Sequence, residues 1–538
     1  MESFAADLRY QPRTPLQPEH VDALRAIGDR TTLPSGAYLA RAGDPMDVFA
    51  YVVEGRLDLV DPITEEPYLP DGLGPGQFAG EMGFLYRGTW TRSMRATQDT
   101  QLLTLCRQRM LDLMAQVPEI SDIVVEVFNA RRRRQLESND TNLTLIGSEV
   151  DAAIQAVEQF AARSRIPFRS FPIDSPEGAE AAAVCGLDAG SPAVIMAPDR
   201  VVTPATPQTV AALMGLDLGV EENASFDVLI VGGGPAGVAA AVYAGAEGLS
   251  ALLIDEIAVG GQAGTSSRIE NYLGFPTGIS GADLLWRGQV QAMKFGTLFA
   301  MPRRVTKIVP NGEGAFTATV DDNVEICCRS MIVATGVQYR RLPLERLEFF
   351  EGNGVFYAAT DLEARHCAGK DVAIIGGGNS AGQAAMHLSR YAGHVYLLVR
   401  GQSLAASMSE YLSSRLNADP RITILYGHQV VALHGESRLE TITVSDRQTG
   451  DNSDLDVGGL FVMAGAAPNT SWLEDLIQLD DRGFVLTGAA VGKQTALETS
   501  TDGIFAVGDV RSGSVKRVAS AAGEGSVVIS SVWSHVNQ

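Results

Sequence analysis

The sequence has few cysteines, and they lie far apart. Its 538 residues contain five, Cys106, Cys185, Cys327, Cys328 and Cys367, and no two of them form a C-x-x-C pair. This spacing excludes a zinc ribbon, an iron–sulfur cluster and a local redox dithiol, so we expect no metal site. Scattered single cysteines are typical of proteins of the reducing cytosol, and we therefore expect a cytoplasmic protein.

Long apolar runs and an excess of positive charge are also missing. No segment approaches the ~18 consecutive apolar residues of a membrane span. The first ten residues carry acids where a signal peptide would be basic and then apolar. The formal net charge is −22, which disfavours nonspecific binding to DNA and to anionic membranes. We expect no membrane span and no nucleic-acid partner.

The length suggests three to four domains at roughly 150 residues each. Residues 30–106 consist of short alternating segments broken by glycine turns, which predicts a small β structure. Residues 107–137 have helical spacing and end in Arg131–Arg134, which we interpret as cations at a helix C-terminus rather than a nucleic-acid patch. We assign residues 1–138 to a first domain.

Residues 141–218 alternate strands and helices in an α/β pattern, with strands expected near 143–146, 168–173 and 193–196 and a helix at 150–163. A polar linker follows at 219–225. From Phe226 onward the chain is rich in glycine, and two similar phosphate-loop segments begin at Gly232 and Gly376. They predict two nucleotide-binding lobes.

The first loop, DVLIVGGGPAG, runs from an apolar strand into G-x-G-x-x-G and then into an alanine-rich helix. Glycines permit the tight turn and let a pyrophosphate approach the positive end of the helix. The next strand ends at Asp255-Glu256, where an acid can accept a hydrogen bond from a ribose hydroxyl. Strand, loop, helix and acid in this order predict a dinucleotide site.

The second loop, DVAIIGGGNSA, has Ala381 in place of the third glycine, and its second strand ends at Arg400 rather than at an acid. A guanidinium suits the 2′-phosphate of NADPH, which an acid would repel. Gly401 leaves a single arginine there, and NADPH is still favoured over NADH.

Residues 226–538 resemble the low-molecular-weight thioredoxin reductase family of flavoproteins. The matching stretches are GGGPAG, GGQAGTSSRIENYLGFPTGISG, ATG, GGGNSA, TSTDGIFAVGDV and KRVASAAGEG. The resemblance implies an FAD domain at 226–339 and 466–538, an inserted NADPH domain at 340–465, and a homodimer. It also implies hydride transfer from nicotinamide to flavin after the two lobes rotate.

By motif matching, the residues that would contact FAD are Gly232, Gly234, Pro235, Ala236, Gly237, Asp255, Glu256, Gly261, Gln262, Asn271, Ala334, Gly336, Gly508, Asp509, Arg517, Val518 and Ala519. Those that would contact NADPH are Gly376, Gly378, Asn379, Ser380, Ala381 and Arg400.

One departure from this family changes the expected chemistry. Where the family carries its redox-active C-x-x-C, the chain reads YAATDLEARHC, with Ala358 and Asp361 at the cysteine positions. Neither side chain can attack or form a disulfide, which excludes the usual dithiol relay. We interpret Cys367 as structural. Asp361 is a candidate for binding substrate or protonating flavin, with an ordinary solvated aspartate as the alternative.

The two N-terminal units carry resemblances of their own. Residues 141–218 resemble a thioredoxin-like domain, with no cysteine in the active-site turn, which favours a scaffolding or docking role. Residues 15–135 resemble a cyclic nucleotide-binding β-roll, and GQFAGEMGFLYRGTWTRSMRAT matches its phosphate-binding cassette. The residues expected to bind cAMP or cGMP are Gly80, Glu81, Arg92 and Ser93, and the alternative is a degenerate domain kept for assembly.

The sequence thus predicts a multidomain protein in which a β-roll and an α/β thioredoxin-like domain precede an α/β two-lobe Rossmann-like flavoprotein. We expect an NADPH-dependent FAD oxidoreductase, regulated by a cyclic nucleotide, that passes electrons to an unknown acceptor. A quinone, a small disulfide, a protein and dioxygen all stay open as acceptors. The alternative is a redox-responsive signalling or scaffold protein with little turnover.

Overall fold

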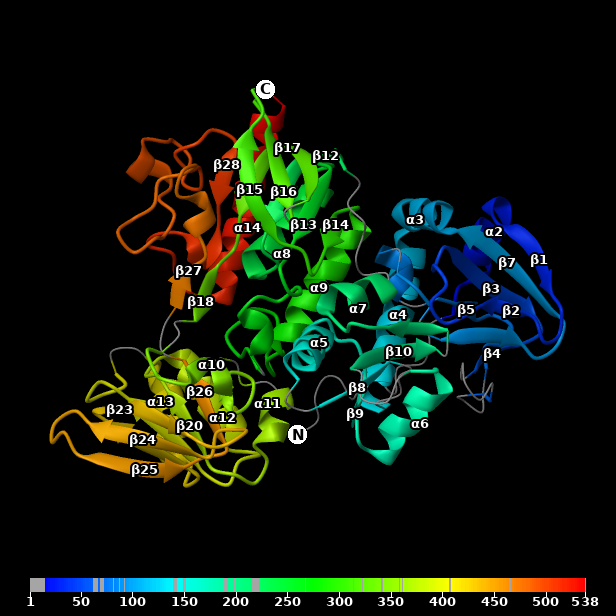
Figure 1. The fold of residues 1–538 in the computed structure, drawn as a ribbon. Helices are drawn as coiled ribbons and strands as arrows, with labels where there is room; N and C mark the ends of the chain where they lie inside the picture. Colours follow the sequence, from blue (N-terminus) through cyan, green and yellow to red (C-terminus); the bar gives the residue numbers. More distant parts are fainter. Residues whose placement is uncertain are drawn as a thin grey trace.

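The computed structural model describes residues 15–60, 66–67, 72–80, 82–86, 88–90, 92–138, 143–148, 151–187, 192–197, 199–214, 222–266, 268–312, 314–321, 323–339, 342–357, 359, 361–405, 408–463 and 466–537. The central lobe (residues 225–339 and 466–537) forms the middle of the molecule. The β-rich N-terminal part lies on one side of it, and the inserted lobe (residues 342–463) lies on the other (Figure 1). Within these ranges, no helix is long and apolar enough to cross a membrane.

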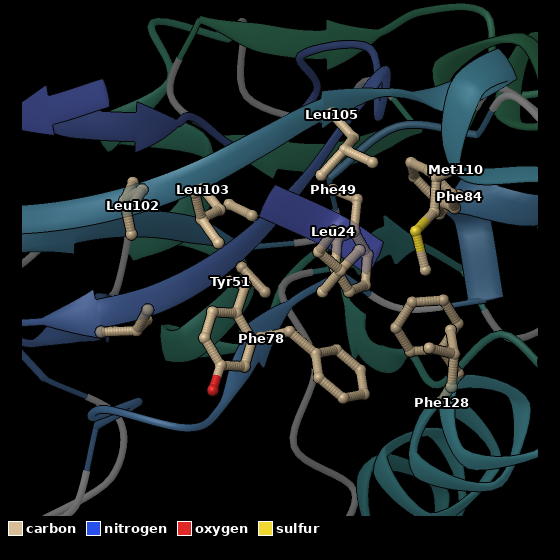
Figure 2. Packing of buried hydrophobic residues seen from close by; sticks show 14 of the residues in the cluster. Leu24, Phe49, Tyr51, Phe78, Phe84, Leu102, Leu103, Leu105, Met110 and Phe128 are labelled. Atoms are coloured by element: carbon tan, nitrogen blue, oxygen red, sulfur yellow. The ribbon is translucent and has the colours of Figure 1, made fainter. Parts of the chain in front are cut away.

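The N-terminal part consists of helix α2 (Pro18–Ile27) and two antiparallel sheets, ordered β1-β7-β3-β5 and β2-β6-β4. A buried aromatic cluster of Phe49, Phe78, Phe84 and Phe128 ties the strands to the helices behind them (Figure 2). The strands are β1 (Asp29–Leu33), β2 (Tyr38–Ala40), β3 (Val48–Glu54), β4 (Leu57–Val60), β5 (Phe78–Ala79), β6 (Ser93–Ala96) and β7 (Thr100–Cys106), with a 3₁₀ helix η1 (Met82–Tyr86).

The helical stretch expected at 107–137 is two helices, α3 (Arg107–Gln116) and α4 (Pro118–Ser138). Pro118 has no N–H to continue the hydrogen bonding of α3, and its fixed φ suits the first position of a new helix. The helical spacing predicts one apolar face made by Met110, Leu113, Met114, Ile120, Ile123, Val124 and Val127. The first six are buried and Val127 is half-buried.

The second unit has the alternation that the sequence predicts. Its elements are β8 (Thr144–Gly147), α5 (Ala152–Arg163), β9 (Arg169–Pro172), α6 (Pro176–Val184), β10 (Ala193–Ala197), β11 (Arg200–Val202) and α7 (Pro207–Leu213). The sheet order is β11-β10-β8-β9, in which β9 runs parallel to β8 and β10 runs antiparallel to it. Asp151 caps α5 by accepting from the N–H groups of Ala153 and Ile154.

The central lobe is built on one sheet, ordered β14-β13-β12-β17-β16-β15, with β28 paired to β17. Helices α8 and α14 pack closely on each other, because Gly525 lets the backbones approach. The elements are β12 (Ser225–Val231), α8 (Pro235–Ala246), β13 (Ala251–Ile254), η2 (Ala263–Thr265), α9 (Gly281–Lys294), β14 (Leu298–Ala300), β15 (Val305–Pro310), β16 (Phe316–Val320), β17 (Val324–Val333), η3 (Ser471–Leu473), η4 (Gly488–Val491), β28 (Ile504–Ala506), η5 (Gly508–Val510) and α14 (Val518–Val536).

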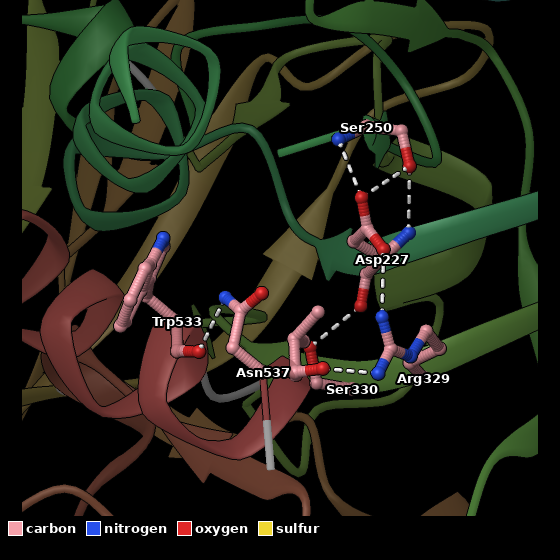
Figure 3. A network of polar contacts seen from close by, with 7 residues as sticks. Asp227, Ser250, Arg329, Ser330, Trp533 and Asn537 are labelled. Atoms are coloured by element: carbon pink, nitrogen blue, oxygen red, sulfur yellow. Dashed lines mark hydrogen bonds and ion pairs between the residues drawn. The ribbon is translucent and has the colours of Figure 1, made fainter. Parts of the chain in front are cut away.

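A polar network fastens the start of β12 to the chain's last helix (Figure 3). Asp227 accepts from the N–H and hydroxyl of Ser250 at 2.9 and 2.8 Å, and its other oxygen lies 3.4 Å from Arg329. Arg329 also donates to the Val536 carbonyl at the end of α14. Burial raises the pKa of Asp227, but these hydrogen bonds and the arginine charge outweigh it and hold the pKa below its usual value.

The inserted lobe has a parallel sheet, ordered β19-β26-β20-β21-β22, and an antiparallel sheet β23-β24-β25. It joins the central lobe through paired strands β18 (Val337–Tyr339) and β27 (Ala466–Pro468). Its elements are α10 (Leu347–Phe350), β19 (Val355–Phe356), α11 (Asp361–His366), β20 (Val372–Ile375), α12 (Asn379–Leu388), β21 (Val395–Val399), α13 (Glu410–Ala418), β22 (Ile422–Tyr426), β23 (His428–His434), β24 (Thr441–Asp446), β25 (Asn452–Asp456) and β26 (Gly459–Val462).

Candidate cofactor and nucleotide sites

The carboxyl ends of three neighbouring parallel strands bring most of the predicted FAD residues together. Strand β12 pairs with β17, and β17 pairs with β28, all parallel. The segments that follow these strands therefore meet at one edge of the sheet, where open α/β sheets bind their ligands. A Cβ built on Gly508 would lie 3.0 Å from Cβ of Ala236, and one on Gly237 would lie 3.3 Å from Cβ of Ala334.

Glycine is required at the three motif positions for different structural reasons. Gly232 has φ 111°, and a Cβ there would meet the Ala334 carbonyl oxygen at 2.4 Å. At Gly237 a Cβ would lie 1.9 Å from the Gly232 carbonyl oxygen, so this glycine lets the helix pack on the strand. Gly234 has an ordinary φ of −72° and open space where its Cβ would be. This cradle at the N-terminus of α8 fits a pyrophosphate.

The structure separates the two acids that follow β13. Both oxygens of Asp255 are used within the loop, because they accept from the N–H groups of Gly233, Ile257 and Ala258 at 2.7–3.0 Å. Asp255 therefore holds the glycine turn in place. Glu256 has a side chain 51% exposed and 3.9 Å from Arg304, so of the two acids it is the candidate to accept from a ribose hydroxyl.

The segment after β28, Gly508-Asp509, is held by two residues that the sequence analysis did not single out. Glu524 on α14 accepts from the Gly508 N–H at 2.6 Å and forms a two-point ion pair with Arg511, at 2.5 and 3.1 Å. Arg511 also donates to the Thr487 hydroxyl. This arrangement fixes the Gly508-Asp509 turn against α14, where burial raises the pKa of Asp509.

We expect Glu524→Gln to weaken this turn. The substitution replaces the carboxylate with a neutral amide and leaves the guanidinium of Arg511 without its counter-ion. The two side chains are only 16% and 18% exposed, so water compensates this loss incompletely. The free energy of unfolding should fall by about 1–3 kcal/mol, and FAD should dissociate at a lower temperature. Thermal melts followed by flavin fluorescence would measure both. Glu474→Gln, at an exposed position, is the control and should leave both transitions unchanged.

Of the other predicted FAD residues, Gly261 and Gln262 contact segments at this edge. Gln262 donates to the Val337 carbonyl, and a Cβ on neighbouring Gly261 would lie 3.0 Å from Cα of Gly234. Gly336 has φ 61°, in the left-handed region that favours glycine. Asn271, Arg517 and Ala519 are exposed and Val518 is half-buried, with Arg517 at the N-terminal cap of α14.

The inserted lobe repeats the first loop at the end of β20. Gly376 has φ 148°, and a Cβ there would lie 2.6 Å from the Met463 carbonyl oxygen. That Cβ would also lie 3.0 Å from Cβ of Ala381, so the alanine at the third motif position packs against the turn at Gly376 and leaves no room for a side chain there. Gly378 caps α12, which begins at Asn379 and Ser380, and Arg400 is exposed directly after β21.

None of the five cysteines is in a disulfide, and Cys328 and Cys367 are buried. Burial raises the pKa of Cys328 and of Cys367 to about 12, so both thiols stay protonated at neutral pH. Cys328 is buried and Cys327 is partly exposed, as expected for opposite faces of β17. Ala358 lies outside the described residues. Asp361 is the first residue of α11, its side chain is not described, and its chemical role stays a prediction.

The predicted cyclic nucleotide residues follow β5 and border β6. Gly80 has φ 133°, Arg92 and Ser93 are buried, and Glu81 lies outside the described residues. The Ser93 hydroxyl oxygen accepts from the Ala42 N–H at 3.1 Å. Arg131 on α4 donates to the carbonyls of Gly80 and Phe78 at 2.6 and 2.7 Å, so this arginine holds strand β5 within the cassette. Helix α4 continues to Ser138 and has no basic residue in its last turn, so the interpretation of Arg131–Arg134 as cations at a helix C-terminus is wrong.

The fold and these two glycine loops define a class: a two-lobe dinucleotide-binding oxidoreductase preceded by a β-roll. The family model described as "Pyridine nucleotide-disulphide oxidoreductase" matches residues 226–525, more than half of the chain. The protein therefore belongs to the pyridine nucleotide-disulphide oxidoreductase family. A second family model, "Cyclic nucleotide-binding domain", matches residues 30–117.

Named relatives agree with this assignment. The chain is 33% identical over 308 residues to NADPH-dependent thioredoxin reductase 3 of Arabidopsis thaliana, covering 56% of each chain. It is 33% identical to the thioredoxin reductase of Streptomyces clavuligerus, covering 56% of this chain and 90% of the relative. The Lactococcus lactis thioredoxin reductase structure (FR conformation) aligns with a TM-score of 0.54 at 28% identity, over 58% of this chain and 99% of that one.

The protein is thus a thioredoxin reductase-like flavoprotein oxidoreductase with a cyclic nucleotide-binding domain, and its cofactors are FAD and NADPH. The cradle over Gly234 and the exposed guanidinium of Arg400 fit these two groups. Homodimer formation and a cytoplasmic location stay predictions.

Proposed function

We propose that the protein oxidises NADPH and passes the electrons to an acceptor outside the chain, without an internal dithiol. The observation that carries this proposal is the absence of any C-x-x-C in the sequence. When bound, FAD accepts hydride from the nicotinamide and can release electrons to a second partner. The residues of this chain would bind and orient the cofactors. Gly234 and the N-terminus of α8 would bind the pyrophosphate of FAD, Glu256 would bind its ribose, and Arg400 would bind the 2′-phosphate of NADPH.

The middle unit supports a scaffolding role in this proposal. Its sheet order, with one parallel and two antiparallel pairings, suits a thioredoxin-like domain. The turn between β8 and α5, at residues 148–151, contains no cysteine. Burial raises the pKa of Cys185, the cap of α6, which disfavours a thiolate there.

We further propose that a cyclic nucleotide regulates the reaction. The contacts of helix α9 support this proposal, because they connect the cassette to the predicted FAD residues. One end of α9 contacts η1 of the cassette, and Val290 is buried in the N-terminal hydrophobic cluster. Lys294 lies 3.4 Å from Asp122 on α4. The other end begins at Gly281, where a Cβ would lie 1.6 Å from the Ala263 carbonyl oxygen, next to predicted FAD ligand Gln262. A shift of the cassette would therefore reach, through one helix, residues 261–271, which carry the predicted FAD ligands Gly261, Gln262 and Asn271 and are called the FAD loop below.

Anaerobic stopped-flow reduction by NADPH, with and without cAMP or cGMP, tests the proposal. Loss of the flavin absorbance on mixing with NADPH would support the enzyme proposal. A rate of flavin reduction that changes with cAMP or cGMP would support regulation. Coupling must be reciprocal in binding, so NADPH must shift nucleotide affinity by the same factor. No reduction under any condition would overturn the enzyme proposal and favour a signalling or scaffold protein.

Cyclic nucleotide binding makes a separate prediction. Arg92→Ala removes a buried guanidinium from the cassette, and a charged hydrogen bond to phosphate should be lost. We expect the dissociation constant, measured by calorimetry, to rise roughly 10- to 100-fold. Arg95→Ala, on strand β6 three residues further along, should change it far less. If the unmodified protein binds neither cAMP nor cGMP, the sensor proposal fails for these ligands.

A further inference from the structure

The inserted lobe touches the FAD loop through its nucleotide-binding end. Tyr411 on α13 donates to Glu270 at 2.8 Å, and Glu270 is the neighbour of predicted FAD ligand Asn271. Arg415, one turn further along α13, donates to the Tyr411 hydroxyl at 2.5 Å and lies 3.6 Å from Glu270. Arg268 pairs with the other oxygen of Glu270 at 3.1 Å. Glu270 is thus held by groups from both lobes.

This contact lies beside the predicted NADPH loop. The Asn379 side-chain oxygen, at the start of α12, accepts from the N–H of Ser409, which caps α13. Tyr411 follows two residues later. One short series of contacts therefore joins the NADPH loop to the FAD loop.

The middle unit bridges the same two lobes at other positions. Gln155 on α5 donates to Asn353 of the inserted lobe at 2.9 Å. Arg165, in the turn after α5, lies 2.6 Å from Asp283 on α9 of the central lobe. Helix α5 lies between α9 and the inserted lobe (Figure 1). A rotation of one lobe against the other would break the Tyr411–Glu270 hydrogen bond and at least one of the two contacts of the middle unit.

We propose that the two lobes are held in one arrangement, with Glu270 and Tyr411 as positioning residues and the middle unit as a brace. This rests on the proposed function, because a flavin without a dithiol partner in its own chain has no need of a second lobe arrangement. The lobe rotation expected from the family resemblance is then unnecessary, and the brace gives the cysteine-free module a task.

Hydrogen–deuterium exchange of the purified full chain tests this without turnover. In Tyr411→Phe, amides of α13 and of residues 268–272 should exchange about fivefold faster, since a hydrogen bond that closes the contact is lost. Glu270→Gln should act in the same way, and the double variant Gln155→Ala/Arg165→Ala should add to it. Tyr243→Phe makes the same chemical change at an exposed tyrosine of α8 and should change nothing.

Small-angle scattering supplies the second measurement. The scattering profile of the unmodified protein should be unchanged by NADP⁺. The variant that combines Tyr411→Phe with Gln155→Ala/Arg165→Ala should expand, and its profile should change when NADP⁺ is added. Equal exchange in the unmodified protein and Tyr411→Phe, or a profile that changes with NADP⁺ in the unmodified protein, would overturn the fixed arrangement. If NADPH cannot reduce the flavin but the exchange pattern is as expected, the proposed function is rejected and the fixed lobe arrangement is still supported.

Discussion

Gly234→Ala should yield a folded protein that retains little FAD. Alanine adopts the φ of this position without strain, and no protein atom lies within 4 Å of the added methyl group. The methyl group would instead fill the space that the pyrophosphate needs. Overpacking of this kind costs about 1–3 kcal/mol, so we expect FAD affinity to fall roughly 5- to 100-fold. The measurements are the flavin-to-protein ratio after purification and the thermal midpoint of the FAD-free protein.

Gly237→Ala is the matched comparison, because the same methyl group there meets protein. It would lie 1.9 Å from a backbone oxygen that cannot move without distorting the turn. We expect Gly237→Ala to lower the thermal midpoint of the FAD-free protein as well as its FAD content. Full FAD affinity in Gly234→Ala would show that this turn does not hold the pyrophosphate.

The second large effect is expected at Arg400. Arg400→Ala removes the exposed guanidinium after β21, and the apparent dissociation constant for NADPH in stopped-flow reduction should rise roughly 10- to 100-fold. The constant for NADH should stay within about twofold, because NADH lacks the 2′-phosphate. A ratio of the two constants that does not change would remove Arg400 from cofactor selection. Arg390→Ala, an exposed arginine just after α12, is the control.

Much of this architecture follows from local sequence patterns. Glycine loops between an apolar strand and a helix place Gly232–Gly237 and Gly376–Ala381 at helix N-termini, because the turn geometry is encoded within about ten residues. The β-roll and the α/β alternation of the middle unit follow in the same way from spacing and turn residues. The division into α3 and α4 at Pro118 is also encoded locally, but apolar periodicity alone does not reveal it.

Contacts between distant segments could not be predicted in this way. The Arg511–Glu524 pair and the Tyr411–Glu270 hydrogen bond join residues whose proximity depends on how helices pack and how lobes are placed. Asp255 and Glu256 are adjacent in sequence and similar in chemistry, and only the fold of the glycine turn assigns one to the loop and leaves the other exposed. Such assignments depend on three-dimensional packing, to which propensity and spacing contribute nothing.

Anaerobic titration of the oxidised protein with NADPH tests the central claim most directly, because it counts the electrons that the chain accepts. NADPH delivers two electrons as hydride, and FAD takes up two. With no internal dithiol, the flavin absorbance should be fully bleached by one equivalent of NADPH per FAD, and thiol titration before and after should give the same number of free cysteines. Uptake of two equivalents per FAD, with two new thiols, would reveal a redox-active disulfide and contradict the account.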